Sequence, residues 1–431
     1  MSTTSYTPVI VDGIRTPFLK SGTEYNNLMA YDLGRYAIQG LLARNDIPLD
    51  QIDRVIMGNV IQEVKTSNIA RESALGAGIP NSVPAFTVSL ACISSNQAIA
   101  SGIDLIKTGQ AKMIIAGGTE TMSDIPVRFK KKFRQKVLAA RKYKSPLDFL
   151  KFFKGLGIKD FLPELPAIAE FSTGETMGKS ADRMAAHFNI SRHDQDEYAM
   201  RSHLMAAKAT EQGLLDEELF PVKVPPKFNI VEQDNGFRAD TTLERLSKLR
   251  PAFIKPHGTI TAGNASFLTD GASATLIMEE QEALRLGLKP KAYLRSYAFV
   301  SQDPKDELLL GPAYATPKVL DDMNLTLNDI GVFEIHEAFA GQVLAVLAAL
   351  DSTEFAKNKL GREDKIGLIP MEKINTRGGS LSLGHPFGAT GARLVTSAAN
   401  RLIKEDHQFA LVTACAAGGQ GHAIILERYP S

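Results

Sequence analysis

Short apolar runs alternate with longer amphipathic segments along most of the chain. In the first half, buried strands are predicted by three runs rich in β-branched residues: YTPVIVDG, DRVIMGNV and AKMIIAGG. A segment with helical spacing, MAYDLGRYAIQGLLARN, lies between the first two. The second half repeats the theme with the strand-like KAYLRSYAF, IGVFEIHEAF and FALVTACAAGG and the helical GQVLAVLAALD and GARLVTSAANRLI. The alternation predicts α/β layers around a largely parallel core.

The last predicted strands of the two halves are alike in kind. Residues 111–118 and 409–419 are each a buried strand that runs into glycines. We interpret this as a weak internal duplication of one α/β unit, although many unrelated α/β proteins have strands that end in glycine. Residues 124–250 follow another pattern, a basic stretch and then helical segments with Ser191 as an N-cap. This region is too long for a loop, and we expect an inserted lid or substrate domain.

Composition narrows the function classes. The chain has 431 residues, enough for two or three domains or two large halves, and its 44% apolar and 23% charged residues are typical of a soluble globular protein. Lys and Arg number 49 against 48 Asp and Glu, so the basic excess of a nucleic-acid-binding protein is absent. No run approaches the ~20 apolar residues of a membrane span, and we see no secretory signal, so we expect a cytoplasmic protein.

The chain has two cysteines, Cys92 and Cys415, and no CxxC motif, which excludes a disulfide scaffold. Cys92 lies between an extended segment and a predicted helix, whose dipole favours the thiolate and can lower the thiol pKa below ~8.5. Cys415 ends a predicted strand and is followed by AAGGQG, whose small residues let backbone N–H groups approach a ligand and stabilise an oxyanion. The alternatives are a small buried core residue for Cys92 and a tight turn at a crowded edge for AAGGQG.

Two histidines lie in segments suited to acid–base chemistry. His385 sits in GGSLSLGHPFGATGAR, a rigid glycine-rich turn that opens a helix. His336, in FEIHEAFAG, lies where a strand meets a helix, beside Glu337, which either orients a neighbour or favours the helix N-terminus. The alternative for both histidines is a satisfied core or surface residue. We interpret three others as surface residues because they fall in charged helical patterns: His187, His193 and His203.

The sequence lacks the motifs of several other chemistries. No metal site with three or four sensibly spaced ligands can be assembled from the sequence, and the signatures of cysteine proteases, GxGxxG and P-loops are absent. Together, however, the segments around the cysteines and histidines resemble the thiolase family nearly end to end. The resemblance rests on RTPF (15–18), SLACISSNQAI around Cys92, AGGTETMS (116–123), GTITAGNASFLTDGASA (258–274), HEAF (336–339), GGSLSLGHPFGATGAR around His385 and CAAGGQG around Cys415.

The resemblance implies the thiolase fold, with two duplicated βαβαβαββ halves stacked as α-β-α-β-α layers and an inserted, mainly helical loop domain. The N-terminal half then comprises residues 1–123 plus 251–285, the inserted lid 124–250 and the C-terminal half 286–431. His336 replaces the Asn of short-chain thiolases, and Ala417 replaces a glycine. Both features resemble the thiolase (β) subunit of the fatty-acid β-oxidation trifunctional complex, in its bacterial form.

The family's mechanism implies a role for each candidate residue. Cys92 attacks the 3-keto carbon of a 3-ketoacyl-CoA and forms an acyl-Cys intermediate, while His385 takes the thiol proton and then helps to hold the oxyanion. Cys415 protonates the acetyl-CoA enolate and later acts as base on the incoming CoA thiol. His336 is expected to take over the polar contact of the family's Asn, directly or through water. The second oxyanion hole uses the backbone N–H groups of Cys92 and Ala417.

The resemblance also implies ligands and partners. Three positions correspond to contacts with the substrate or its CoA arm: Ser266, Met177 and Phe339. CoA enters as a substrate, and no further cofactor and no metal are expected. A homodimer is expected, within a heterotetramer that includes a larger subunit with enoyl-CoA hydratase and 3-hydroxyacyl-CoA dehydrogenase activities. No nucleic-acid partner is expected.

The basic stretch at 128–160 has a pattern of its own. Phe149, Phe152, Phe153 and Leu156 are spaced i, i+3, i+4 and i+7, which predicts one apolar helix face, and lysines lie around it. A basic amphipathic helix can lie on a membrane surface or dock on a partner. The alternative is an ordinary lid helix that packs on its own core.

Three rival functions stay open at this point. A decarboxylating ketoacyl synthase shares the fold and a Cys–His–His set, but lacks a catalytic cysteine at the position of Cys415. A short-chain acetoacetyl-CoA thiolase working in the condensing direction is disfavoured by HEAF and by the insert. A non-catalytic lipid carrier has no need for two positioned thiols and two histidines.

Overall fold

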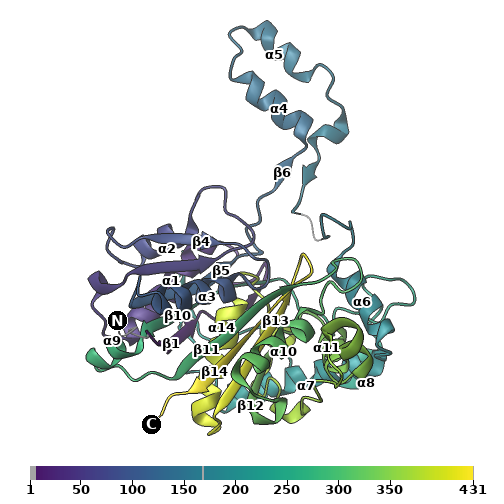
Figure 1. The fold of residues 1–431 in the computed structure, drawn as a ribbon. Coiled ribbons are helices and arrows are strands. Elements are labelled where there is room, and N and C mark those ends of the chain that lie inside the picture. Colours follow the sequence, from purple (N-terminus) through teal and green to yellow (C-terminus); the bar gives the residue numbers. More distant parts are fainter. Residues whose placement is uncertain (1–5, 167–168, 431) are drawn as a thin grey trace.

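The central element is a sheet of ten strands that runs through both halves of the chain (Figure 1). The structure is a computed structural model, which describes residues 6–166 and 169–430. Across the described residues the strand order is β12-β13-β14-β11-β1-β10-β5-β3-β4, and β2 pairs with β10 beside this path. The N-terminal half supplies β1 (Pro8–Arg15), β2 (Leu19–Lys20), β3 (Arg54–Gly58), β4 (Ala85–Val88), β5 (Met113–Glu120) and β10 (Thr269–Glu279). The C-terminal half supplies β11 (Ala292–Ser301), β12 (Ile330–Ile335), β13 (Phe409–Ala416) and β14 (Gln420–Arg428).

The two halves repeat one strand pattern. In the first, β3 is parallel to β5, β5 antiparallel to β10, and β10 antiparallel to β1. In the second, β12 is parallel to β13, β13 antiparallel to β14, and β14 antiparallel to β11. An antiparallel pairing of β1 with β11, through Val9–Tyr293 and Ile10–Ala292, joins the two. The predicted duplication is confirmed, whereas the prediction of a largely parallel core was wrong, because the short turn between β13 and β14 forces these strands to run antiparallel.

Helices cover both faces of each half of the sheet. The outer face of the first half carries α1 (Ala30–Arg44) and α2 (Ile69–Gly76), with α9 (Glu280–Arg285) after β10. The middle layer holds α3 (Ser94–Lys107) and α14 (Thr390–Lys404), which touch each other and strands of the sheet. The outer face of the second half carries α10 (Gly311–Met323) and α11 (Ala340–Leu350), followed by α12 (Thr353–Phe355) and α13 (Ser380–Leu383).

The side chains of each strand alternate between the two faces of the sheet, which explains why helices cover both faces. On β5, Ile114 belongs to the core around α3 and α14, whereas its neighbour Ile115 belongs to the core under α1 and α2. On β13, Val412 faces the middle layer and Leu411 the outer one. Because successive side chains of a strand point to opposite faces, an unbroken apolar run is buried on both sides. The predicted α-β-α-β-α stacking is confirmed.

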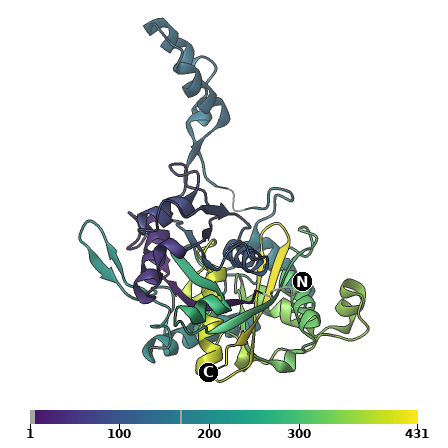
Figure 2. The same cartoon turned by 60° about the vertical axis from the view of Figure 1, so that its left-hand side comes forward.

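The region between the halves has two parts, one that projects from the body and one that packs on it (Figures 1 and 2). A two-stranded stalk, β6 (Arg128–Phe129) with β7 (Pro163–Glu164), carries α4 (Lys131–Ala140) and α5 (Pro146–Phe153) away from the body. The later elements are α6 (Met177–His187), α7 (Arg192–Glu211), the hairpin β8 (Val222–Val224) with β9 (Asn229–Val231), and α8 (Leu243–Ser247). Of these, α6, α7 and α8 contribute to the same core as α10 and α11.

Local signals define several of these boundaries. Ser191 caps α7 as predicted, accepting a hydrogen bond from the backbone N–H of Asp194. Ser145 caps α5 in the same way. That helix ends at Phe153, so Leu156 lies beyond it, and the predicted single apolar face is shorter than the sequence spacing indicates.

Candidate active site

Cys92 lies on a tight turn between the end of β4 and the start of α3. Ala91 before it has a φ of 47°, in the left-handed region that residues with a side chain rarely adopt. The Ser94 hydroxyl holds this turn, accepting from the Leu90 N–H at 2.8 Å and donating to the Ala91 carbonyl at 2.7 Å. The turn therefore presents the thiol directly before the first residues of the middle-layer helix.

The surroundings of Cys92 do not stabilise its thiolate at rest. Burial raises the pKa of the Cys92 thiol to about 11, and the backbone N–H groups of Ala417 and of Cys92 itself act in the opposite direction. The predicted lowering by the helix dipole was wrong, because desolvation of the sulfur outweighs the few dipoles that reach it. The resting site thus holds a neutral thiol that needs a base.

His385 supplies a ring nitrogen next to that thiol. It follows Gly384, whose φ of 110° favours glycine, and its backbone N–H donates to the Thr269 hydroxyl at 2.9 Å. Its Nδ1 lies 2.6 Å from Oγ1 of Thr390, while its Nε2 is buried without a hydrogen-bond partner among the described residues. Burial, with a smaller effect from Arg393, lowers the pKa of His385 to about 3, so its ring is neutral.

His336 reaches the same space from the other side. It comes directly after β12, where its backbone N–H donates to the Thr413 carbonyl on β13 at 2.9 Å. Its Nδ1 lies 2.9 Å from Oγ of Ser380, and its Nε2 too is buried without a partner in the described part of the chain. Burial first, then His385 and Arg393, hold the pKa of His336 well below its usual value.

Three reactive groups therefore converge on one point. The Sγ of Cys92 and one ring nitrogen each from His336 and His385 all lie within 4.8 Å of one another. This spacing is also compatible with a soft metal ion, a cluster that sequence spacing could not reveal because the residues come from three separate segments. A thiol facing two neutral imidazoles can lose its proton to one of them as it attacks a carbonyl, with the other donating to the carbonyl oxygen.

Cys415 lies near the end of β13, opposite Gly421 on β14, and is 1% exposed. Burial, and then the neighbouring Cys92, raise the pKa of the Cys415 thiol well above its ordinary value. The turn that follows needs two residues in the left-handed region, which Gly418 and Gly419 provide. This turn places the backbone N–H of Ala417 at the sulfur of Cys92.

The three residues expected to contact substrate or CoA lie around the HEAF segment. The backbone N–H of Ser266 donates to the Ala338 carbonyl at 3.0 Å, and a bridge pairs Ala265 with Phe339. Phe339 packs edge-on against Phe253, at 6.0 Å between ring centroids. Met177 begins α6 and packs on the core cluster that contains both Phe339 and Cys415.

Two features that position the His385 loop were missed by sequence reasoning, although both lie in AGGTETMS. Glu120 is fully buried and accepts N–H groups from Val60, Ile61 and Gly388 at 2.9–3.0 Å, which ties the loop after His385 to the loop after β3. Burial raises its pKa to about 8. A Cβ on Gly118 would lie 1.8 Å from the Gly388 carbonyl, so only glycine allows this close approach. A glutamate within an otherwise small, apolar strand was the available signal.

The other three histidines for which the sequence predicts a surface position differ in exposure. His187 and His193 are exposed, as predicted. His203 is buried, and its Nδ1 accepts a hydrogen bond from the Arg238 N–H at 3.3 Å, so the prediction of a surface residue was wrong. The charged residues around it in α7 obscure the apolar side of that helix, on which Ala199 and Ala206 are also buried.

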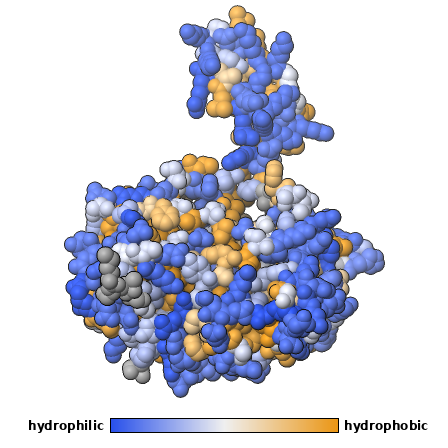
Figure 3. All heavy atoms as spheres, in the orientation of Figure 1, coloured by the Kyte–Doolittle hydropathy of each residue, from blue (hydrophilic) through white to orange (hydrophobic). Residues whose placement is uncertain are grey.

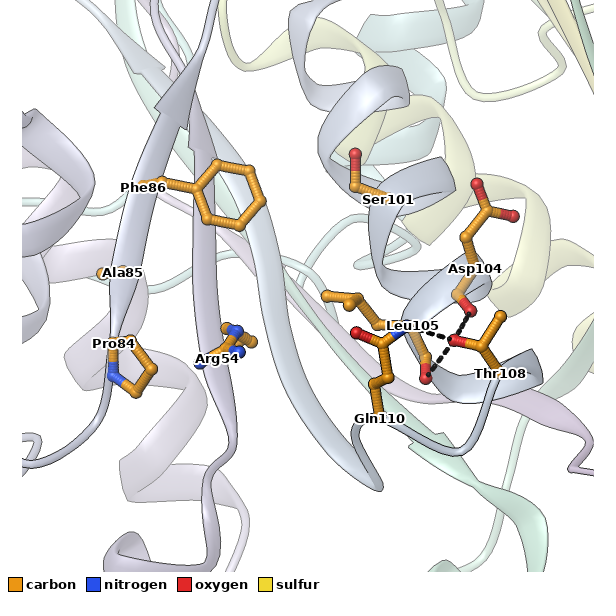
Figure 4. A pocket seen from close by; sticks show the side chains of 9 residues that line it. All are labelled: Arg54, Pro84, Ala85, Phe86, Ser101, Asp104, Leu105, Thr108 and Gln110. Atoms are coloured by element: carbon orange, nitrogen blue, oxygen red, sulfur yellow. Dashed lines mark hydrogen bonds between the residues drawn. The ribbon is translucent and has the colours of Figure 1, made fainter.

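An open groove of about 640 Å³ lies away from this site, between β4 and α3 (Figure 4). Phe86 on β4 points toward it, and Ser101, Asp104 and Leu105 face it from the helix. None of the candidate catalytic residues lines it. The groove marks the outer edge of the sheet rather than the reaction centre.

A duplicated five-layer fold that brings a nucleophilic thiol, two imidazoles and a second thiol together defines a cysteine-dependent acyltransferase. The family models for the thiolase N-terminal domain and the thiolase C-terminal domain match residues 8–281 and 288–428. The chain belongs to the thiolase family.

Its relatives span nearly the whole chain. The bovine (Bos taurus) protein named trifunctional enzyme subunit beta, mitochondrial, is 60% identical, over 98% of this chain and 88% of its own length. A probable 3-ketoacyl-CoA thiolase of Caenorhabditis elegans is 55% identical, over 98% and 94%. A 3-ketoacyl-CoA thiolase of Yersinia enterocolitica is 45% identical, over 97% and 96%. The bacterial relative is thus less similar than these two eukaryotic ones.

Solved structures agree on the fold. The Bacillus anthracis acetyl-CoA acetyltransferase superposes with a TM-score of 0.85 at 31% identity, covering 99% of this chain and 100% of that one. Human mitochondrial 3-ketoacyl-CoA thiolase gives 0.85 at 30% identity, covering 99% of each chain. Within the described ranges, no helix is both long and apolar enough to cross a membrane.

Proposed function

We propose that the protein is a 3-ketoacyl-CoA thiolase of fatty-acid β-oxidation, which uses CoA to cleave a 3-ketoacyl-CoA into acetyl-CoA and a shortened acyl-CoA. The observation that carries this proposal is the Cys92 thiol within 4.8 Å of a ring nitrogen of both His336 and His385, with a second thiol, Cys415, on the adjacent strand end. Relatives named 3-ketoacyl-CoA thiolase at 45–55% identity support the same substrate.

The reaction uses these groups in two halves. In the first, the Cys92 proton passes to His385 while the sulfur attacks the 3-keto carbon, and cleavage of the carbon–carbon bond leaves an acyl group on sulfur. Cys415 donates its proton to the acetyl-CoA enolate and becomes a thiolate. In the second half, that thiolate takes the proton of the incoming CoA thiol, which then attacks the acyl-Cys carbonyl. The Cys92 sulfur leaves as a thiolate and recovers its proton from His385, so the resting state is restored.

Two sets of donors stabilise the oxyanions. The first comprises Nε2 of His385 and Nε2 of His336, which have no other partner among the described residues and would face the 3-keto oxygen. The second comprises the backbone N–H groups of Cys92 and Ala417, which already contact the sulfur and can hold the thioester oxygen of the acyl-Cys. Alanine serves at 417 because only its amide donates. Ser266, Met177 and Phe339 are proposed to line the route of the CoA arm, and CoA is the one organic group the reaction needs.

Thiolysis of short-, medium- and long-chain 3-ketoacyl-CoA tests the proposal, with Cys92→Ala and Cys415→Ala alongside the exposed control His187→Ala. We expect kcat/KM to increase with chain length, with both cysteine variants inactive and the control unchanged. Activity confined to acetoacetyl-CoA would move the protein to the short-chain class. A Cys415→Ala variant as active as the parent would favour the synthase-like alternative.

A second subunit is part of the proposal. The mammalian relatives carry the name subunit beta of a trifunctional enzyme, which supports a partner that performs the hydratase and dehydrogenase steps before thiolysis. Co-expression with such a subunit from the same organism, followed by size-exclusion chromatography with light scattering, tests it. Two chains eluting separately at micromolar concentration would count against a heterotetramer.

A homodimer through the β4 edge is also proposed. β4 ends the sheet and pairs only with β3 among the described strands, so a second strand could add along its outer edge beside the exposed ring of Phe86. On that edge the Ala85 carbonyl accepts from the Asn68 side chain at 2.9 Å. Phe86→Asp should then shift the mass toward one protomer in light scattering. Leu284→Asp, which changes an exposed leucine on α9, should not.

The insert is proposed to touch an anionic membrane surface. Residues 128–160 contain twelve Lys and Arg and two Asp, and α4 with α5 stands clear of the body (Figure 3). Phe133 on α4 packs against Phe152 on α5, with 5.7 Å between ring centroids. On α5, Leu147, Leu150 and Phe153 remain 71%, 69% and 62% exposed. This surface of apolar side chains within a basic hairpin fits a headgroup boundary.

Flotation with vesicles rich in phosphatidylserine or cardiolipin tests the contact. The parent should float, and the double variant Leu147→Asp, Leu150→Asp should stay at the bottom. The control Leu368→Asp replaces a leucine with 65% exposure elsewhere on the surface and should float like the parent. Flotation of the double variant would indicate that the insert serves the partner subunit instead.

A reducing compartment, the cytoplasm, is the proposed location. The site depends on two free thiols, which an oxidising compartment would endanger. Several relatives are named mitochondrial, so fractionation that finds the protein in mitochondria would overturn the cytoplasmic assignment.

A further inference from the structure

Each active-site imidazole is hydrogen-bonded at Nδ1 to one buried hydroxyl, and each hydroxyl makes one further hydrogen bond. The Thr390 hydroxyl lies 2.6 Å from Nδ1 of His385 and 3.0 Å from the Pro386 carbonyl. The Ser380 hydroxyl lies 2.9 Å from Nδ1 of His336 and 3.1 Å from Nη2 of Arg393. A hydroxyl has a single hydrogen, so its second hydrogen bond determines whether it donates to the ring nitrogen or accepts from it.

The second contacts are of opposite kind. A carbonyl only accepts, so Thr390 donates to Pro386 and its lone pair accepts from Nδ1–H of His385. A guanidinium only donates, so Ser380 accepts from Arg393 and gives its own hydrogen to Nδ1 of His336. The reverse arrangement would set two lone pairs face to face at Thr390, or leave the fully buried Ser380 hydrogen without an acceptor.

We infer that Thr390 and Ser380 hold the two histidines in opposite tautomers, so that Nε2 of His385 offers a lone pair while Nε2 of His336 offers an N–H. The evidence for these tautomers is the hydrogen bonding alone, whereas their catalytic role rests on the proposed function. Thr390, Ser380 and Arg393 thereby become positioning residues, acting through the imidazoles rather than on the substrate.

The opposite tautomers fit the first chemical step. The proton of Cys92 moves to the lone pair on Nε2 of His385, and the electron pair of the S–H bond stays on sulfur to attack the carbonyl. His385 then carries N–H on both nitrogens, so both Nε2–H groups face the same developing oxyanion. One proton transfer thus converts a base and a donor into a pair of donors.

The same relay assigns His336 as a hydrogen-bond donor rather than an acid. Its Nδ1 already receives the Ser380 hydrogen, and Arg393 behind Ser380 cannot accept a proton. His336 therefore keeps its Nε2 hydrogen throughout the cycle. Because that nitrogen has no lone pair to offer, the Cys92–His336–His385 cluster is also a poor metal site despite its spacing.

Nitrogen NMR reads the tautomers directly. The full-length protein, labelled with ¹⁵N-histidine, has eight histidines to resolve in long-range ¹H–¹⁵N spectra. His336→Asn and His385→Asn identify the two signals. We expect the Nε2–H pattern for His336 and the Nδ1–H pattern for His385. The same tautomer on both rings, or the two reversed, would overturn the inference. No substrate is added, so this result is independent of whether the protein cleaves 3-ketoacyl-CoA.

Thr390→Val tests the less common tautomer, because valine keeps the shape and removes the acceptor. The Nδ1–H pattern of His385 should be lost, and kcat should fall by about 10²-fold as the base is blocked. Thr390→Ser should restore both. Thr396→Val, the same change on the same helix at a hydroxyl that has no partner within the described part of the chain, controls for folding. Thr390→Val with an unchanged NMR pattern and unchanged kcat would contradict the role of Thr390.

Discussion

The imidazole rings of His336 and His385 lie 4.1 Å apart, centroid to centroid, at an angle of 44°. They reach this contact from unrelated connections, His336 from the end of β12 and His385 from the turn between α13 and α14. A charge on either ring would be unpaired, buried and close to the other, so both stay neutral at rest. The pair is therefore built for unequal roles, one ring changing its protonation and the other not.

Replacing each histidine by asparagine should separate these roles. His385→Asn removes the base and should lower kcat by about 10²- to 10⁴-fold. His336→Asn retains an N–H donor of similar reach, and we expect a loss of about 10-fold, since only the geometry of one hydrogen bond changes. Single-turnover acylation by a 3-ketoacyl-CoA measures both. Equal losses in the two variants would contradict the division of roles.

The reactivity of Cys92 should depend on pH far into the alkaline range. Its pKa is raised to about 11 by burial, so the thiolate fraction in the free enzyme rises about tenfold for each pH unit below that value. Alkylation by iodoacetamide, followed by mass spectrometry of the Cys92 peptide, should increase from pH 7 to pH 9 without a plateau. Cys92→Ser gives the background from Cys415. A plateau near neutral pH would show a preformed thiolate instead.

Much of this site could be predicted from the sequence because each key residue lies in a segment whose local geometry is encoded locally. Cys92 precedes a helix, and glycines crowd His385 and follow Cys415, as the spacing indicates. The hydroxyl partners could not be predicted in this way. Ser380 meets His336 across 44 positions of the chain, and serines of this kind are common in turns.

The wrong predictions share a cause, because each concerns a property that depends on tertiary structure rather than on the local sequence. The pKa of Cys92 depends on how deeply the sulfur is buried, which no helix pattern reports. His203 lies on a helix whose charges suggest solvent, yet its side chain faces the body. The duplicated halves could be predicted only in outline, because strand direction depends on which connections are short, such as the turn at Gly418 and Gly419.

Acid should destabilise the protein through its buried histidines. The pKa of His422 is lowered to about 3, and it stays neutral in the fold, whereas in the unfolded chain it takes a proton near pH 6.5. The unfolded state therefore binds more protons as the pH falls below that value, and the free energy of unfolding declines by about 1.4 kcal/mol per pH unit for this one group. His203, with a pKa of about 4, adds to the effect.

Urea unfolding of His422→Leu at about pH 7 and about pH 5 measures this contribution. The variant should lose less stability than the parent on acidification, by about 2 kcal/mol over that range. His193→Gln, which alters an exposed histidine, should follow the parent. Parallel curves for parent and His422→Leu would mean that His422 is protonated in the fold.

Glu337, next to His336, anchors the helix that carries Ser380. Its carboxylate is fully buried and accepts from the Tyr198 hydroxyl at 3.0 Å, Ser202 at 2.8 Å, Asn375 at 2.6 Å and the backbone N–H of Leu381 at 3.1 Å. The four donors come from α7, from the segment just before α13 and from α13 itself. This one side chain therefore fixes the position from which Ser380 meets the His336 ring.

Glu337→Gln keeps the shape but turns one acceptor oxygen into a donor. Leu381 N–H or the Asn375 amide then faces another N–H, and we expect a loss of about 2 kcal/mol in the free energy of unfolding. Because α13 is released along with Ser380, kcat should fall as well, while Glu197→Gln on the exposed side of α7 changes neither quantity. Urea unfolding and thiolysis on the same preparations test both effects. Full stability with full activity would mean that the other contacts of α13 suffice to hold Ser380 against His336.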